Sequence, residues 1–104
     1  MSIAVAKLSD LPEEGALRVQ VGSIAVCLAR SGGEVFAVND VCSHADVSLS
    51  EGDVEDGTVE CWLHGSRFDL RTGRPTGLPA TKPVATYPVT IEGDDVIVAV
   101  EDAQ

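Results

Sequence analysis

Two short segments of this sequence, Cys42-Ser43-His44 and Cys61-Trp62-Leu63-His64, each place a thiol and an imidazole within a few residues of one another. They contain both histidines of the chain and two of its three cysteines. Thiolate and neutral imidazole are ligands of zinc, copper and iron–sulfur centres. Four such groups in two matched pairs predict a metal site, so the chain must fold in a way that brings the two segments together.

The order of these groups separates two kinds of metal centre. A Cys2His2 zinc finger takes both cysteines from one hairpin and both histidines from one helix. Here each segment supplies one Cys and one His, and neither segment lies in a helical pattern. A cluster with two unlike irons suits this order, because the thiolates bind one iron and the imidazoles bind the other. A structural zinc site remains the alternative.

The two segments, followed by Gly65-Ser66, resemble the ligand motif of the Rieske 2Fe–2S family. The resemblance covers most of the chain, since Gly77-Leu78-Pro79-Ala80 is similar to the proline loop of that family. It implies an all-β fold: a small antiparallel sandwich or barrel with an inserted cluster-binding subdomain. We expect one domain over residues 1–104, with the cluster-binding subdomain at roughly 39–83.

The resemblance also implies the ligands of a Rieske-type 2Fe–2S cluster. By the family pattern, Cys42 and Cys61 hold the buried ferric iron, and His44 and His64 hold the outer iron. Between two of these ligands, Trp62 is interpreted as part of a hydrophobic shell around the cluster, with a docking patch as the alternative.

Some residues depart from the high-potential members of the family. The extra cysteine pair of those proteins is absent, with Val47 and Leu63 at the matching positions. Phe68 stands where they have a hydrogen-bonding tyrosine, whereas Ser66 is retained and could donate to a bridging sulfide. Fewer hydrogen bonds to sulfur favour the lower part of the Rieske range, nearer about −150 mV than about +300 mV. This pattern resembles the ferredoxins of bacterial ring-hydroxylating dioxygenases.

Alternating apolar residues and turn signals predict strands throughout the chain, and no window before the first ligand segment has a convincing helical period. Two hairpin turns are expected at Ser31-Gly32-Gly33 and at Asp56-Gly57. Cys27 has no partner in the motif and is expected to pack as a small buried hydrophobic residue. The expected strands are residues 3–7, 17–21, 23–29, 35–38, 53–55, 58–61, 67–70, 85–91 and 96–100.

The negative charge is concentrated around the ligand segments. The formal net charge is −10, and residues 42–70 contribute −6 of it, from seven acidic residues and one base, Arg67. So few basic residues exclude nucleic acid as a partner, because phosphate binding needs Lys and Arg. Two interpretations stay open for the acidic residues: steering towards basic patches on redox partners, or solvation alone.

The sequence contains no apolar run long enough to span a membrane and no secretory leader pattern. Thiols retained as metal ligands suit a reducing compartment, so the expected location is the cytoplasm.

The function implied by the resemblance is electron transfer. We expect a ferredoxin that carries single electrons from an NAD(P)H-dependent flavoprotein reductase to a terminal oxygenase and is not itself a catalyst. A Rieske oxygenase needs a second iron held by two further histidines, and both histidines here are already assigned. The alternatives are a related role in iron–sulfur assembly, a nitrite reductase small subunit, or the zinc module.

Overall fold

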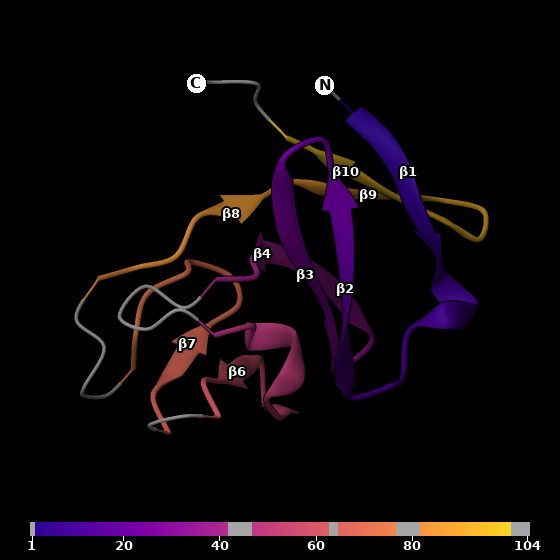
Figure 1. The fold of residues 1–104 in the computed structure, drawn as a ribbon. Helices are drawn as coiled ribbons and strands as arrows, with labels where there is room; N and C mark the ends of the chain where they lie inside the picture. Colours follow the sequence, from indigo (N-terminus) through magenta and orange to yellow (C-terminus); the bar gives the residue numbers. More distant parts are fainter. Residues whose placement is uncertain (1, 42–46, 63–64, 77–81, 101–104) are drawn as a thin grey trace.

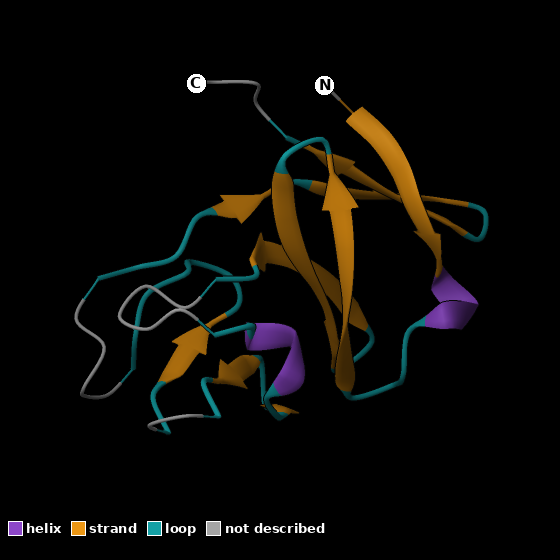
Figure 2. Cartoon of the chain, in the orientation of Figure 1, coloured by secondary structure: helices purple, strands orange, loops and turns teal. Residues whose placement is uncertain are grey.

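The structure, a computed structural model, describes residues 2–41, 47–62, 65–76 and 82–100. In this part of the chain the regular structure is antiparallel β-sheet with two short 3-10 turns, η1 (Leu8–Asp10) and η2 (Leu49–Glu51) (Figure 2). The predicted all-β class is confirmed. The strands are β1 (Ser2–Lys7), β2 (Gly15–Val21), β3 (Ile24–Ser31), β4 (Glu34–Asn39), β5 (Val54–Glu55), β6 (Thr58–Glu60), β7 (Arg67–Asp69), β8 (Thr86–Tyr87), β9 (Val89–Glu92) and β10 (Asp95–Ala99).

These strands form three sheets. The terminal sheet has the order β1-β10-β9, the central sheet β2-β3-β4-β8 and the small sheet β5-β6-β7. The small sheet and η2 lie beside one end of the central sheet, away from the terminal sheet (Figure 1). The chain enters the region of the small sheet after β4 and returns through β8, so this region is an insertion between two strands of the central sheet.

Two hydrophobic cores hold the sheets together. One lies between the terminal and central sheets and includes Val26, Leu28, Val96 and Val98, all fully buried. The other joins the central sheet to the small sheet. Its buried members are Cys27, Ala29, Val38, Leu49, Val54, Val59, Cys61, Phe68, Leu70 and Val84. The central sheet is therefore covered on both faces, as the long apolar run of β3 requires.

One predicted strand is divided in two. The sequence predicted a single strand over residues 85–91, but β8 pairs with β4 in the central sheet, and β9 pairs with β10 in the terminal sheet. Pro88 lies between them and has no N–H to donate to a ladder. Its carbonyl oxygen instead accepts a hydrogen bond from Ala99 N–H at 3.0 Å. The proline is the point at which the chain passes from one sheet to the other.

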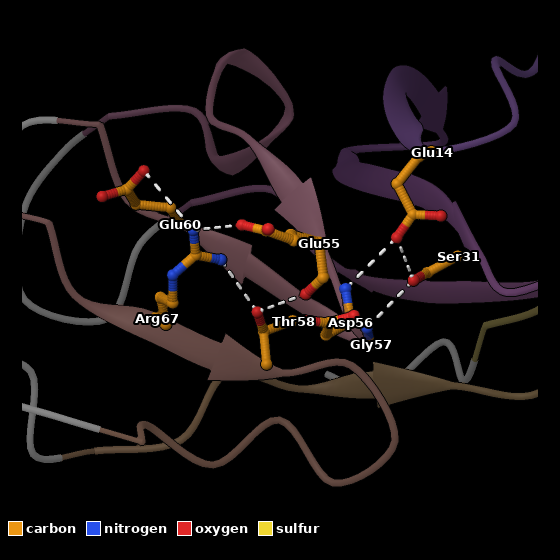
Figure 3. Close-up of polar contacts among 8 residues, drawn as sticks. All are labelled: Glu14, Ser31, Glu55, Asp56, Gly57, Thr58, Glu60 and Arg67. Atoms are coloured by element: carbon orange, nitrogen blue, oxygen red, sulfur yellow. Dashed lines mark hydrogen bonds and ion pairs between the residues drawn. The ribbon is translucent and has the colours of Figure 1, made fainter.

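The predicted turn at Asp56-Gly57 is confirmed and carries a contact between the small and central sheets. Both residues have positive φ, 53° and 75°, as a two-residue hairpin turn requires. Figure 3 shows Glu14 and Ser31 from the central sheet side pointing at this turn. Glu14 accepts from the Ser31 hydroxyl (2.5 Å) and Asp56 N–H (3.2 Å), and Ser31 Oγ accepts from Gly57 N–H (2.9 Å). These hydrogen bonds, led by that from Ser31, lower the pKa of Glu14 below its usual value.

A second contact between these sheets lies nearby, at Arg71. Its guanidinium donates to both carboxylate oxygens of Glu34, at 2.8 and 3.1 Å, and its charge lies 5.2 Å from the ring centroid of Phe36. Arg71 follows the small sheet, whereas both partners belong to β4. Polar contacts therefore help to orient the small sheet, while the shared core buries its apolar residues.

None of the helical turns in the described ranges is long and apolar enough to cross a membrane.

The Ser31 hydroxyl is expected to stabilise the junction between the two sheets. Ser31→Ala removes the donor to Glu14 and leaves Gly57 N–H without its acceptor. This should lower the free energy of unfolding by about 1–2 kcal/mol. Urea unfolding of the variant beside the wild type measures the change. Ser23→Ala, in an exposed turn of the central sheet, is the matched control and should change stability by less than about 0.5 kcal/mol. Equal effects of the two substitutions would contradict a role for the junction.

Candidate metal centre

The second ligand segment begins as β6 ends. Cys61 N–H donates to Ser66 O at 2.6 Å, and Gly65 N–H donates to Cys61 O at 2.8 Å. Gly65 has φ of 78°, a conformation that costs glycine little. The backbone at the two ends of this segment is therefore closed into a tight turn, with Cys61 at its start. His64, the other predicted ligand of this segment, lies outside the described residues.

Cys61 has the environment expected of a cluster ligand. Its side chain is completely buried among apolar residues of the second core, and its thiol is free. An apolar, water-free setting suits a thiolate that binds iron, because the metal neutralises its charge. Trp62, the next residue, is 49% exposed. This exposure favours the docking alternative for Trp62 over the interpretation as a hydrophobic shell.

The first ligand segment is held at both of its ends. Val41 and Ser48 form an isolated antiparallel bridge. Just outside this bridge, Leu49 N–H donates to Asp40 O at 2.6 Å. Cys42 and His44, the two predicted ligands in between, lie outside the described residues. The described flanks on either side of these two ligands therefore lie side by side, and we call them the neck of the segment.

The necks of the two segments lie against one another. Leu49 is fully buried in the same core as Cys61, and Val47 packs on that core. Gly52 lies so close to the chain before Cys61 that an added Cβ would overlap the carbonyl oxygen of Glu60. Only glycine leaves room for this approach. The requirement comes from the backbone of β6, and not from a residue pattern, so Gly52 was not identified from the sequence.

Arg67, on β7, forms polar contacts with neighbouring acidic residues. Figure 3 shows Arg67 pointing towards Glu55, Glu60 and Thr58. Its guanidinium donates to Thr58 Oγ1 (2.9 Å) and Glu55 Oε1 (3.4 Å) and lies 3.9 Å from Glu60 Oε1. Arg67 is thus an ion-paired residue of the small sheet. Glu60 directly precedes Cys61, so this network braces the start of the second ligand segment.

A third segment approaches the small sheet after β7. Gly73 N–H donates to Asp69 O at 2.7 Å, and Val84 N–H donates to Gly73 O at 2.8 Å. A Cβ on Gly73 would overlap the carbonyl oxygen of Val84, so this glycine provides a close approach, and its φ of 77° also favours glycine. The stretch similar to the proline loop, residues 77–80, lies outside the described residues.

The other predicted features near the site have clear positions. Phe68 is fully buried in the second core, and Ser66 is 1% exposed. Cys27 is fully buried in the same core, which confirms its predicted packing role. Burial, with a smaller contribution from the nearby Asp40 carboxylate, raises the pKa of the Cys27 thiol to about 12. A thiol held in this protonated state is a poor metal ligand and a poor nucleophile.

Comparison with known proteins agrees with this geometry. Residues 1–88 match the Rieske [2Fe-2S] domain. The chain belongs to this family. The match confirms the predicted Rieske-type 2Fe–2S cofactor, and the described residues fit it, because a free, buried thiol stands at Cys61 beside the neck of a second loop. Cys61 is the one predicted ligand that the structure describes.

Two of the similar proteins are ferredoxins that cover nearly the full length of this chain. The ferredoxin subunit of the 3-phenylpropionate/cinnamic acid dioxygenase of Escherichia coli (strain K12) is 47% identical over 98 residues, which are 93% of this chain and 92% of that protein. The ferredoxin of carbazole 1,9a-dioxygenase from Nocardioides aromaticivorans IC177 has a TM-score of 0.92 and 36% identity, covering 97% and 99% of the two chains. The predicted resemblance to dioxygenase ferredoxins, which are electron-transfer components rather than catalysts, is confirmed.

A third similar structure is a complex. It is described as the reduced oxygenase and oxidised ferredoxin of carbazole 1,9a-dioxygenase. The matching chain has a TM-score of 0.88 and 33% identity, covering 94% of this chain and 92% of that one. A Rieske ferredoxin of this shape thus forms a complex with its terminal oxygenase.

The close approach at Gly52 gives a testable requirement for cluster binding. Gly52→Ala should push the first segment away from Glu60 and lower the iron content and visible absorbance of the purified protein at least twofold. Gly22→Ala is the control, because Gly22 also resists substitution through its φ of 62° but has open space around it and lies in a turn of the central sheet. Full cluster content in the Gly52 variant would show that this approach is not required.

Proposed function

We propose that this protein is the ferredoxin component of an aromatic ring-hydroxylating dioxygenase system. It carries single electrons from an NAD(P)H-dependent flavoprotein reductase to a terminal oxygenase. The observation that carries this proposal is the similarity, along nearly the full length of both chains, to a dioxygenase ferredoxin subunit. When bound, the cluster accepts and releases one electron at a time. The protein binds the cluster, excludes water from it and presents it to each partner in turn.

The cluster ligands in this proposal are Cys42, His44, Cys61 and His64. Support comes from the burial of Cys61, from its free thiol, and from the closed neck of the segment that contains Cys42 and His44. We assign the cluster-binding subdomain to residues 39–83 of a single domain. The Ser66 side chain, almost fully buried at the turn with Cys61, is the proposed hydrogen-bond donor to the cluster, and Phe68 adds none. The expected potential is accordingly in the lower part of the Rieske range.

The surface around the second ligand segment suits transient docking. Trp62 presents a large, half-exposed apolar side chain beside a proposed ligand. Glu51 and Asp53 are exposed on the connection that leads to the small sheet, and neither forms an ion pair with a described residue. The nearby Arg67 pairs with Glu55 and Glu60 instead of with these two acids. An apolar centre with an acidic rim favours fast, salt-sensitive association with basic partners.

The proposed location is the cytoplasm, because a reducing compartment keeps ligand cysteines as thiols and supplies the nicotinamide cofactor of the reductase. The relative solved in complex with its oxygenase supports a terminal oxygenase as the acceptor. A role in iron–sulfur assembly remains the alternative. The proteins encoded by the neighbouring genes would distinguish this role from a dioxygenase system.

The ligand assignment is tested by electron paramagnetic resonance of the dithionite-reduced protein. The wild type should give a rhombic signal with the low average g of a mixed His/Cys cluster. Cys42→Ser and Cys61→Ser should each abolish that signal. Cys27→Ala is the matched control, because it removes the third thiol from the same core and should keep the signal. A colourless wild-type protein that contains one zinc would contradict the electron-transfer role.

The docking surface is tested in a reconstituted system of reductase, this protein and oxygenase, in which product formation should require this protein. Replacing Glu51, Asp53 and Glu55 together by their amides should slow electron transfer several-fold at low salt and weaken its salt dependence, because screening no longer has a charge to act on. Amides at Glu92, Asp94 and Asp95, on the distant β9–β10 turn, are the control with equal charge. Equal rates in both variants would remove the steering role, and product formation without this protein would refute its function as the carrier.

A further inference from the structure

Asp40 is a buried carboxylate at the entry to the first ligand segment. It follows the last residue of β4 and is only 1% exposed. A buried charge is costly unless it is paired and hydrogen-bonded. Its position therefore calls for an explanation, because neither the fold class nor the ligand motif requires an acid there.

Asp40 connects the central sheet to both ends of the first ligand segment. Its N–H donates to Ala25 O of β3 at 2.9 Å, which fixes it to the sheet. On the far side of the segment, its carbonyl oxygen accepts from Leu49 N–H at 2.6 Å, and its Oδ1 accepts from Ser50 N–H at 2.9 Å. One residue thus holds the chain that enters the segment and the chain that leaves it.

The second carboxylate oxygen is used differently. Oδ2 is buried and has no hydrogen-bond partner among the described residues. It lies 3.3 Å from Nε of Arg18 on β2, and the Arg18 side chain is 57% exposed. The carboxylate is thus on the protein side of the pair and the guanidinium on the solvent side. Water screens Arg18 more strongly than it screens Asp40.

We propose that the Arg18–Asp40 pair positions the first ligand segment and lowers the reduction potential of the cluster. The inference rests on the proposed function, with Cys42 as a ligand. Two residues of chain span at most about 7 Å, so the Cα atoms of Asp40 and Cys42 are separated by no more than this distance. Reduction adds a negative charge to the cluster, and a nearby carboxylate opposes this addition. Arg18 offsets part of the effect, but less than fully because it is exposed.

The test is a set of charge variants with the potential as the main readout. Asp40→Asn keeps an oxygen that accepts from Ser50 N–H and removes the charge. It should leave the resonance signal of the reduced cluster unchanged and raise the reduction potential at pH 7. Arg18→Gln keeps the carboxylate and should lower the potential by a smaller amount. The double variant should lie between the two single variants.

A matched ion pair is available as the control. Lys7 and Asp95 are paired at 2.6 Å between β1 and β10, and both side chains are exposed. These two strands belong to the terminal sheet, which lies away from the small sheet (Figure 1). Asp95→Asn removes the same charge and should not move the potential. If Asp40→Asn moves the potential no more than Asp95→Asn does, the electrostatic role is overturned.

The positioning of the first ligand segment by Asp40 is tested separately, by amide hydrogen exchange. In Asp40→Asn the exchange of the Leu49 and Ser50 amide protons with solvent should stay slow, and in Asp40→Ala the Ser50 amide should exchange at least tenfold faster. If Asp40→Asn fails to retain the cluster, Arg18→Gln decides the potential alone: a lower value supports the proposal, and an unchanged value overturns it. Failure of the underlying function is a separate result, because the wild type would then lack the Rieske signal altogether.

Discussion

Burial of Cys61 in a core shared by two sheets is the constraint on which the rest of the structure depends. The small sheet has strands of only two or three residues, at or below the usual minimum length, so it relies on a partner surface to bury its apolar face. The central sheet supplies that surface through residues such as Val38 and Cys27. The same burial removes water from the thiol that is proposed to bind iron. Folding and cofactor binding therefore use the same apolar contacts.

Hydrophobic burial is not directional, and the orientation of the small sheet comes from polar contacts at its edge. Glu14 and Ser31 hold the Asp56-Gly57 turn, and Arg71 pairs with Glu34. All of these groups have fixed hydrogen-bond geometry, so they define one arrangement among the many that an apolar interface allows. A one-electron carrier benefits from such rigidity, because a fixed site needs little rearrangement when its charge changes.

Charge is arranged differently at the surface and in the interior of the insertion. At the surface, Arg67 is surrounded by Glu55 and Glu60, and further acids remain exposed. Such charges act over distance on an approaching partner and are screened by salt. In the interior, the Asp40 carboxylate is buried, so water and salt screen its charge less than they screen the exposed acids. In the roles proposed above, the exposed acids act on association with a partner and Asp40 acts on the reduction potential of the cluster.

The sequence by itself determined the metal chemistry, the all-β class and most strands, because ligand spacing, alternation and turn residues such as Asp56-Gly57 act locally. It did not predict the break at Pro88, since a short run of β-formers does not specify the sheet in which each residue pairs. It also did not identify the roles of Gly52 and Asp40. Gly52 lies against the Glu60 carbonyl of the adjoining hairpin, and Asp40 pairs with Arg18, which is distant in the chain. Steric fit and burial of a charge depend on such neighbours, and only the tertiary structure brings them together.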